Sequence, residues 1–442
     1  MRSFNSLLVL ALSFFAAVIG IAAMLASGAP AYLGTYIPQS DLMTDYAFGV
    51  ILAVMCYAII MFCPVDFSDR IGLMTVWSIK IMVALGFMLY YEEFYPFLDA
   101  YSYFALPRAP GFSWEGFVIG DGTANTYNLI WLYYRVFPDS FHALKVFSGF
   151  VGLWAVYLFY RAGLIVLGRK DLRLLYLLAL FPSILFWSST IGKEPVVLFA
   201  IGLYVYGAVA WYERGHLSAL VLLSLGIALS VLVRIWLGPI LLAPLLITTL
   251  FERHGIAKRW VWITLAVGAF AFILALVREQ FAIETIRDLL ETIDATSKSQ
   301  DFGGSSQEVA ADLTQPGQFI EALPLAMFTA LFRPLPGEVA NVFGFIAGIE
   351  NFTLLTLLGI AASRIRVADL RDPVIVWALL FILAWTAAYA FAFISYQNLG
   401  TAVRYRVQIL PVLLGMLLYF ACKRKSPIQR GIGGGNRVTP GG

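Results

Sequence analysis

Acidic, basic and aromatic residues that could do chemistry gather where long apolar segments of this sequence end. Asp99 follows an acidic and aromatic run that begins at Glu92, and it precedes Tyr101 and Tyr103. A carboxylate at the end of an apolar helix and beside aromatic rings suits a general base, because partial removal of water makes such a group more basic. The same residues also fit an interfacial belt of Tyr and Phe beside solvated acids. The segment alone leaves both interpretations open.

Two short turns between apolar segments carry charges that could bind a phosphate. Lys193 and Glu194 follow three hydroxyl residues, and Lys193 could hold a phosphate there. The same pair could instead neutralise a tight hairpin whose hydroxyls cap the next helix. Arg234 stands in another such turn, where its planar fork could bind a phosphate or its side chain could reach lipid headgroups.

Two clusters near the C-terminal end add further candidates. Arg333 and Glu338 enclose two prolines and a glycine, which predicts a rigid, non-helical corner that keeps the two charges near each other. Arg404 and Arg406 enter the last apolar segment two residues apart. Residues at this spacing point to different faces of a helix, so at most one of the two arginines faces a given pocket. Anchoring to lipid phosphates is the alternative role for both.

Two charges lie deep inside apolar segments, where an ionised group is costly without a partner or a task. These are Lys80 and Glu350, which we place at similar depth. We therefore expect a structural ion pair between them, with a charged lining of a polar cavity as the alternative.

The composition decides the class of protein to which these residues belong. Of 442 residues, 60% are hydrophobic and only 13% are charged, and the mean hydropathy is +0.82. Soluble domains carry roughly a quarter charged residues. A soluble enzyme, a disordered chain and a nucleic-acid binder are therefore excluded. The three cysteines lie in or beside apolar runs and indicate neither a disulfide framework nor a metal site.

Apolar runs of about 20 residues predict membrane-spanning helices. We expect an all-α, polytopic integral membrane protein with twelve spans. They are residues 7–27, 46–64, 71–91, 143–160, 174–190, 195–212, 217–233, 236–252, 260–277, 340–362, 373–394 and 405–422. Residues 281–293 have the spacing of an amphipathic surface helix, residues 301–306 that of a flexible turn, and residues 319–333 that of a re-entrant or surface piece.

Lysine and arginine collect in short loops on one side of this path, which predicts that both the N- and the C-terminus are cytoplasmic. Residues 1–425 then form a single transmembrane domain, and its two long outer loops are residues 92–142 and 278–339. The glycine-rich residues 426–442 are expected to be a disordered cytoplasmic tail. The first span is longer than the apolar core of a cleaved signal peptide, so we expect it to be retained.

The order of these clusters resembles the GT-C superfamily, the polytopic glycosyltransferases that use polyprenyl-phosphate-linked sugars. The sequence most resembles a group of bacterial membrane proteins that look related both to these enzymes and to surface-polysaccharide polymerases. The resemblance covers about residues 90–415, and the motifs that carry it are Asp99 with Tyr101 and Tyr103, Gly122-Thr123-Ala124-Asn125-Thr126-Tyr127, Tyr133 to Ser140, Leu158-Phe159-Tyr160-Arg161, Phe181 to Glu194, the Arg234 turn, Phe332-Arg333-Pro334, and Arg404-Tyr405-Arg406 with Pro411. One departure is that Ala100 follows Asp99, where many of these enzymes have a second acidic residue.

The resemblance implies transfer of a sugar from a lipid-phosphate donor to an acceptor glycan or lipid on the periplasmic face of a bacterial inner membrane. Asp99 takes the place of the catalytic aspartate, and a divalent cation, Mg²⁺ or Mn²⁺, is left open as a cofactor. The residues expected to bind substrate are Lys193, Arg234 and Arg333 toward the phosphate, Tyr101 and Tyr103 toward the sugar or lipid, Glu194 or Glu338 as a second acid, and Arg404. The alternatives are a polysaccharide polymerase or ligase, and a transporter or flippase of lipid-linked sugars.

Overall fold

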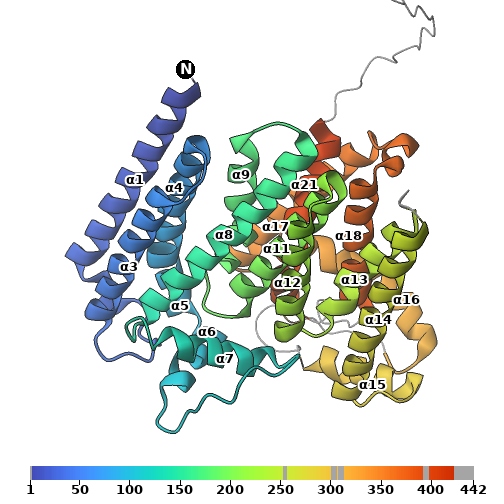
Figure 1. Ribbon diagram of the computed structural model, residues 1–442. Helices are drawn as coiled ribbons and strands as arrows, with labels where there is room; N and C mark the ends of the chain where they lie inside the picture. Colours follow the sequence, from blue (N-terminus) through green and yellow to red (C-terminus); the bar gives the residue numbers. More distant parts are fainter. Residues whose placement is uncertain (1, 252–255, 300–305, 307–312, 392–397, 423–442) are drawn as a thin grey trace, which may run out of the picture.

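The computed structural model describes residues 2–251, 256–299, 306, 313–391 and 398–422, which fold into a bundle of helices (Figure 1). Within these ranges no strand forms, and the single β-bridge joins Ser306 to Asn398. The predicted all-α class is therefore confirmed for the described part of the chain. Two predicted features, most of the turn at residues 301–306 and the tail at residues 426–442, lie outside it.

The helices have the following bounds in chain order. They are α1 (Arg2–Ser27), α2 (Ala29–Tyr32), α3 (Leu42–Phe62), α4 (Phe67–Met82), the π-helical turn η1 (Val83–Phe87), α5 (Met88–Phe94), α6 (Asp99–Ala105), the 3₁₀ turn η2 (Leu106–Arg108), α7 (Gly122–Tyr133), α8 (Phe141–Leu167), α9 (Leu172–Ala179), α10 (Pro182–Trp187), α11 (Lys193–Arg214), α12 (Leu217–Val233), α13 (Leu237–Phe251), α14 (Ile256–Gln280), α15 (Ile286–Lys298), α16 (Pro316–Phe332), α17 (Val342–Ala362), the 3₁₀ turn η3 (Val367–Arg371), α18 (Pro373–Phe391), α20 (Leu399–Arg406) and α21 (Leu410–Cys422).

Seven helices in the described ranges are long and apolar enough to cross a membrane. They are α1, α3, the continuous segment from α4 to α5, α8, α11, α17 and α18. The pair α20 and α21 would be an eighth, bent by 73° at its break, and α12 and the start of α13 are shorter apolar helices. The protein is therefore a multi-pass membrane protein, although the twelve expected spans are not all continuous long helices.

Two of the expected spans are broken by proline. Residues 174–190 form α9 and α10, because Pro182 lacks a backbone N–H and stands at the start of α10. Residues 405–422 include the bend between α20 and α21, with Pro411 in the first turn after it. These prolines end one helix and begin the next at a new angle.

The two pieces expected at the surface are helices. The amphipathic helix predicted at residues 281–293 is α15, and it begins later because Thr285 and Asp288 cap its N-terminus with reciprocal hydrogen bonds. Residues 319–333 belong to α16, which continues through Pro324 and packs against α18 and α20.

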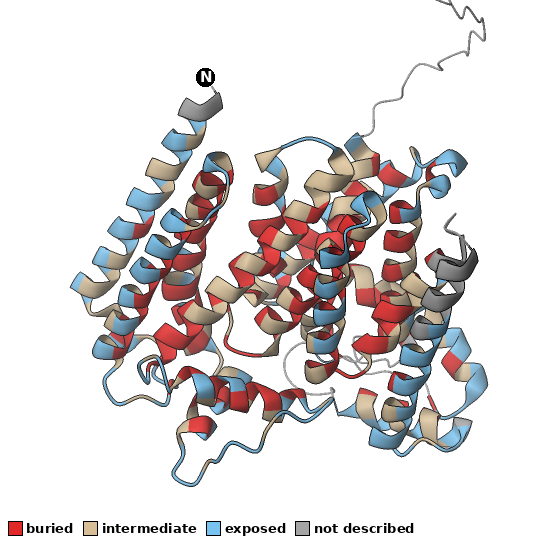
Figure 2. Ribbon diagram, viewed as in Figure 1, coloured by how far each residue is buried: buried red, intermediate tan, exposed pale blue. Residues whose placement is uncertain are grey.

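The core of the bundle lies around α8 and α11, which pack on each other and carry many of the buried residues (Figure 2). α11 and α12 approach most closely at two glycines. A Cβ on Gly226 would lie 2.5 Å from the backbone nitrogen of Tyr204, and one on Gly207 would lie 2.6 Å from that of Leu223. Small residues at such a crossing let two membrane helices come into backbone contact.

The ion pair expected between Lys80 and Glu350 does not form. The Lys80 ammonium donates to the Ser188 and Ser189 hydroxyls at 2.6 and 2.8 Å. Glu350 instead accepts a hydrogen bond from the Ser183 backbone N–H at 2.7 Å. Ser188 and Ser189 stand in the break between α10 and α11. Their hydroxyls and the Ser188 carbonyl satisfy the buried ammonium group of Lys80.

The two ends of the bundle differ. The first turn of α1 and the last turn of α21 lie at one end, and α6, α7 and α15 lie at the other (Figure 1). Segments from the two predicted outer loops, residues 92–142 and 278–339, therefore share the end opposite the first turn of α1 and the last turn of α21. Cys56, Cys63 and Cys422 form no disulfide.

Candidate functional site

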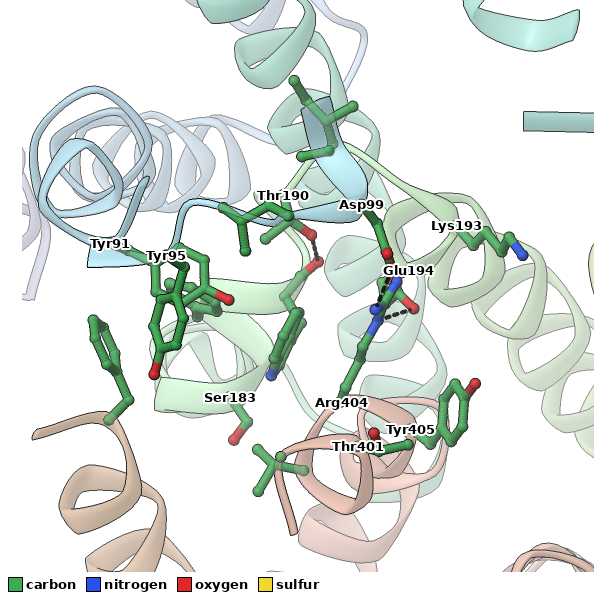
Figure 3. A pocket seen from close by; sticks show the side chains of 18 of the residues that line it. Tyr91, Tyr95, Asp99, Ser183, Thr190, Lys193, Glu194, Thr401, Arg404 and Tyr405 are labelled. Carbon is green, nitrogen blue, oxygen red and sulfur yellow. Dashed lines mark hydrogen bonds and ion pairs between the residues drawn. The ribbon is translucent and has the colours of Figure 1, made fainter. Parts of the chain in front are cut away.

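A cavity of about 820 Å³ opens among α5, α6, α10, α17 and α20 and reaches the ends of α11 and α12. It brings together residues that lie far apart in the sequence, including Asp99, Lys193, Glu194, Arg234 and Arg404. Figure 3 shows that one side of the cavity is charged and the other aromatic.

The charged side is a continuous chain of ion pairs, the charged cluster, made of Asp99, Arg404, Glu194 and Arg234. Arg404 donates from Nε to Glu194 Oε1 at 2.7 Å and from Nη1 to Asp99 Oδ2 at 2.7 Å. Arg234 donates from Nη2 to the same Glu194 Oε1 at 3.0 Å. The side chains of Glu194 and Arg234 are each only 4% exposed, whereas that of Asp99 is 62% exposed. The cluster therefore runs from a buried pair out to a solvated carboxylate.

Helix geometry explains why Glu194 and Arg234 meet. Glu194 is in the first turn of α11, and Arg234 is the residue at which α12 ends. Because α11 and α12 form a close hairpin through Gly207 and Gly226, the start of one helix lies beside the end of the other. The guanidinium of Arg234 also lies 4.3 Å from the ring centroid of Tyr405, which α20 supplies.

Lys193 enters the cavity beside this cluster but binds a different element. Its ammonium donates to the Thr123 hydroxyl at 2.7 Å, and Figure 3 shows it pointing away from Arg404. Thr123 stands at the start of α7, which Asp121 caps by accepting from the backbone N–H groups of Thr123 and Ala124. Asp121 and Thr123 also line the cavity.

The aromatic side joins α5 and η1 to α10 and α17. The Tyr91 ring lies 4.9 Å from that of Phe186 and 5.1 Å from that of Phe343, and the Phe87 ring lies 5.7 Å from Phe343. Phe87 and Ile346 line the cavity, and Phe94 on α5 and Phe345 on α17, which do not line it, are 53% and 56% exposed. The aromatic wall therefore continues to the apolar outside of the bundle.

The two tyrosines predicted to contact substrate have different places. Tyr103 lines the cavity, and burial together with the nearby Asp99 and Glu194 carboxylates raises the pKa of its phenol, so the hydroxyl stays protonated. Tyr101 does not line the cavity, and its hydroxyl donates to the Glu92 carbonyl at 2.8 Å. Only Tyr103 is placed to touch a bound molecule.

The corner at Arg333 and Glu338 is non-helical and keeps the two charges together, as its sequence predicts, but neither charged residue lines the cavity. Arg333 Nε donates to Glu338 at 2.9 Å, and Glu338 also accepts from the Leu335 backbone N–H at 2.6 Å. Pro334 of this corner does line the cavity. The corner shapes the wall, and its charges are paired with each other.

Arg404 and Arg406 separate as their spacing predicts. Arg404 faces the cavity, whereas Arg406 is fully buried, is absent from the lining and donates to the Leu331 carbonyl. Of the two arginines, only Arg404 belongs to the charged cluster, where it contacts both Glu194 and Asp99.

Glu350 is a further carboxylate in the cavity, the place that the sequence analysis offered as the alternative to an ion pair with Lys80. It is 4% exposed, and its Oε1 atom has no hydrogen-bond partner among the described residues. A charge inside an apolar span indicates that Glu350 has a partner or a task. Its partner, the backbone N–H of Ser183 at the start of α10, could not be predicted, because the hydropathy pattern does not show where the helix breaks.

The carboxylates do not fit a divalent cation. Among the described residues no group of three or more His, Cys, Asp or Glu side chains is arranged to hold one. The two acids at the charged side, Asp99 and Glu194, are both bound by Arg404. We therefore derive no step through a metal.

Comparison with protein-family models, with curated proteins and with solved structures gives no match. The fold and the cavity define the class, a multi-pass helical membrane protein with a charged and aromatic cavity at one end of its bundle.

Proposed function

We propose that the protein is a membrane glycosyltransferase that moves a sugar from a polyprenyl-phosphate-linked donor to an acceptor glycan or lipid. In this proposal it works on the periplasmic face of a bacterial inner membrane. The observation that carries the proposal is the cavity itself. One space joins three cations and a solvated carboxylate to an aromatic wall that reaches the apolar surface of the bundle.

Each side of the cavity suits one part of such a donor. The apolar chain would lie along the lipid-facing surface and pass Phe87 and Phe343 into the cavity. The phosphate would lie against Arg404, Arg234 and Lys193, since guanidinium groups bind phosphate oxygens in pairs. The sugar would then lie between these cations and the aromatic rings, near Tyr103.

The transfer step follows from this placement. Asp99 takes the proton from an acceptor hydroxyl, and the acceptor oxygen forms a bond to the anomeric carbon of the sugar. The bond from that carbon to the phosphate oxygen breaks, and its electron pair stays on the phosphate. The arginines stabilise the charge that grows there. The products are the glycosylated acceptor and the polyprenyl phosphate.

The proposal is tested with two variants that each remove one negative charge from the cavity. Sugar transfer is measured in proteoliposomes that contain undecaprenyl-phosphate hexoses with a labelled sugar. Asp99→Asn is expected to reduce transfer by about 10²- to 10⁴-fold, the usual contribution of a general base. Asp121→Asn, which removes a carboxylate from the same cavity and leaves a good helix cap, should retain transfer.

Two results would redirect the assignment. If Asp99→Asn retains transfer while Arg234→Ala and Arg404→Ala abolish it, the polymerase or ligase reading replaces the base-dependent one. If the labelled donor crosses the bilayer with its sugar still attached, the protein is a flippase.

A further inference from the structure

We propose that Asp99 is the resident ligand of the Arg404 guanidinium in the substrate-free protein, and that an incoming phosphate takes its place. Binding of the phosphate would then free the Asp99 carboxylate. The inference deepens the proposed function, because the freed group is the one assigned as base. Its anion-binding half depends only on the geometry of the charged cluster.

Arg404 is held from one side and offers the other. Glu194 binds it through two atoms, Nε at 2.7 Å and Nη2 at 3.2 Å, and Glu194 is almost fully buried. This fixes the plane of the guanidinium. Its remaining nitrogen, Nη1, donates to Asp99 at 2.7 Å. The arginine therefore presents a fixed donor at a place that Asp99 now fills.

Asp99 is weakly held at that place. Arg404 is its only hydrogen-bonding partner among the described residues, and its side chain is 62% exposed. Asp99 also stands at the first position of α6, a short helix preceded by an exposed segment. Exposed ion pairs of this kind are weak, because water competes for both charges. The pair can therefore open without disturbing the buried part of the cluster.

The charge balance favours a phosphate over Asp99 as the partner of Arg404. The charged side of the cavity is lined by three cations, Lys193, Arg234 and Arg404, and by the two carboxylates of Asp99 and Glu194. If Asp99 withdraws, three cations and one buried carboxylate remain on this side. A phosphate can then accept hydrogen bonds from more than one of these cations at once, which a single carboxylate on α6 does not do in the observed geometry.

If Asp99 and the phosphate compete for Arg404, removing the Asp99 charge should strengthen phosphate binding. Replacing a residue in a binding site normally weakens binding, but replacing a resident competitor strengthens it. Asp99→Asn should bind undecaprenyl phosphate about 2- to 5-fold more tightly than the wild type, since an exposed ion pair is worth that much. Asp121→Asn removes the same charge from the same cavity without touching Arg404, and it should change affinity less than 2-fold.

The measurement is equilibrium binding of radiolabelled undecaprenyl phosphate to the full chain in nanodiscs, with inorganic phosphate as competitor. A gain in Asp99→Asn for both ligands would assign the site to the phosphate group itself. A gain for undecaprenyl phosphate alone would assign it to the lipid-linked form. Asp99→Ser provides a second variant, and the melting temperature of each variant checks its fold.

The proposal is overturned if Asp99→Asn and Asp99→Ser fold normally and bind undecaprenyl phosphate no more tightly than the wild type. It is also overturned if Asp121→Asn gains as much affinity, because the effect would then be one of net charge. A wild-type protein that binds the phosphate but transfers no sugar would contradict the proposed function alone.

Discussion

At the scale of single residues, Glu194 organises the site more than Asp99 does. In the part of the chain that the structure describes, it is the one carboxylate that contacts both Arg234 and Arg404, and it is buried with Arg234. Taking three charges out of water is costly, and here mutual hydrogen bonds offset that cost. The geometry of the outer, exposed groups depends on this buried centre.

Glu194→Gln should therefore destabilise the protein by about 3 kcal/mol, the lower end for a broken buried pair, because Arg404 is partly exposed. Thermal unfolding in detergent measures the change. Glu291→Gln on α15, which breaks an exposed pair with Arg287, is the control and should leave the melting temperature nearly unchanged. Equal shifts in the two variants would show that the Glu194 cluster contributes no special stability.

The residues of the charged side could be predicted from the sequence, but their partners could not. Their charges stand at the ends of apolar segments, which indicated Asp99, Lys193, Glu194 and Arg234. Arg404 and Arg406 are two positions apart in a helix and were therefore expected to point to different faces. Nothing local could pair Asp99 with Arg404, because the two residues are 305 positions apart. The pairing of Lys80 was predicted wrongly for a related reason, since its partners lie at a helix break that hydropathy does not reveal.

At the scale of elements, the hairpin of α11 and α12 sets the distance between Glu194 and Arg234. Gly207 and Gly226 let the two helices touch through their backbones, as small residues do in many membrane bundles. The ends of the helices then bring the acid and the arginine into contact at the cavity. A wider crossing would separate them.

Gly226→Ala should destabilise the hairpin by about 1–3 kcal/mol, because the added methyl group would overlap the backbone of α11. It should also weaken undecaprenyl phosphate binding, since Arg234 moves with α12. Gly359→Ala on α17 is the control: nothing lies within 4 Å of its added methyl group, so stability should be kept or slightly increased. Unfolding and binding assays on both variants check this, and a neutral Gly226→Ala would show that the contact is not tight.

Hydropathy predicted where apolar helices lie but not where they break. The residues assigned to the fifth span form two helices because Pro182 starts a new one, and the last span bends before Pro411. The first break borders the cavity through Pro182 and Ser183, and the second follows the last turn of α20, where Arg404 lines the cavity. Irregular backbone at membrane depth is tolerated where it lines a cavity, which is why the pattern fails at the site itself.

At the scale of the whole molecule, the first turn of α1 and the last turn of α21 lie at one end of the bundle, and α6 and α7, which border the cavity, lie at the other (Figure 1). The connection between α8 and α9 belongs to the first end and carries Arg169 and Lys170, and Arg173 follows in the first turn of α9. Basic loops stay in the cytoplasm as a rule. With these basic residues on the cytoplasmic side, as the charge pattern predicts, the cavity would face the periplasm.

Single cysteines in a background without Cys56, Cys63 and Cys422 test this orientation in intact cells. Ala109→Cys, in the exposed segment after η2, should react with a membrane-impermeant maleimide. Arg169→Cys, whose parent side chain is 71% exposed, should react only after the membrane is permeabilised. The reverse pattern would place the cavity on the cytoplasmic side and contradict the periplasmic reaction.

The proposed reaction breaks the bond between a sugar and a lipid phosphate. The most direct measurement uses undecaprenyl-phosphate hexoses that carry ³H in the sugar and ³²P in the phosphate, presented to the wild-type protein in proteoliposomes with a membrane extract as the source of acceptors. We expect that ³H moves to the acceptor while ³²P remains as undecaprenyl phosphate. If the two labels stay together with every donor tested, whether or not the lipid changes leaflet, the protein is not a glycosyltransferase that uses these donors.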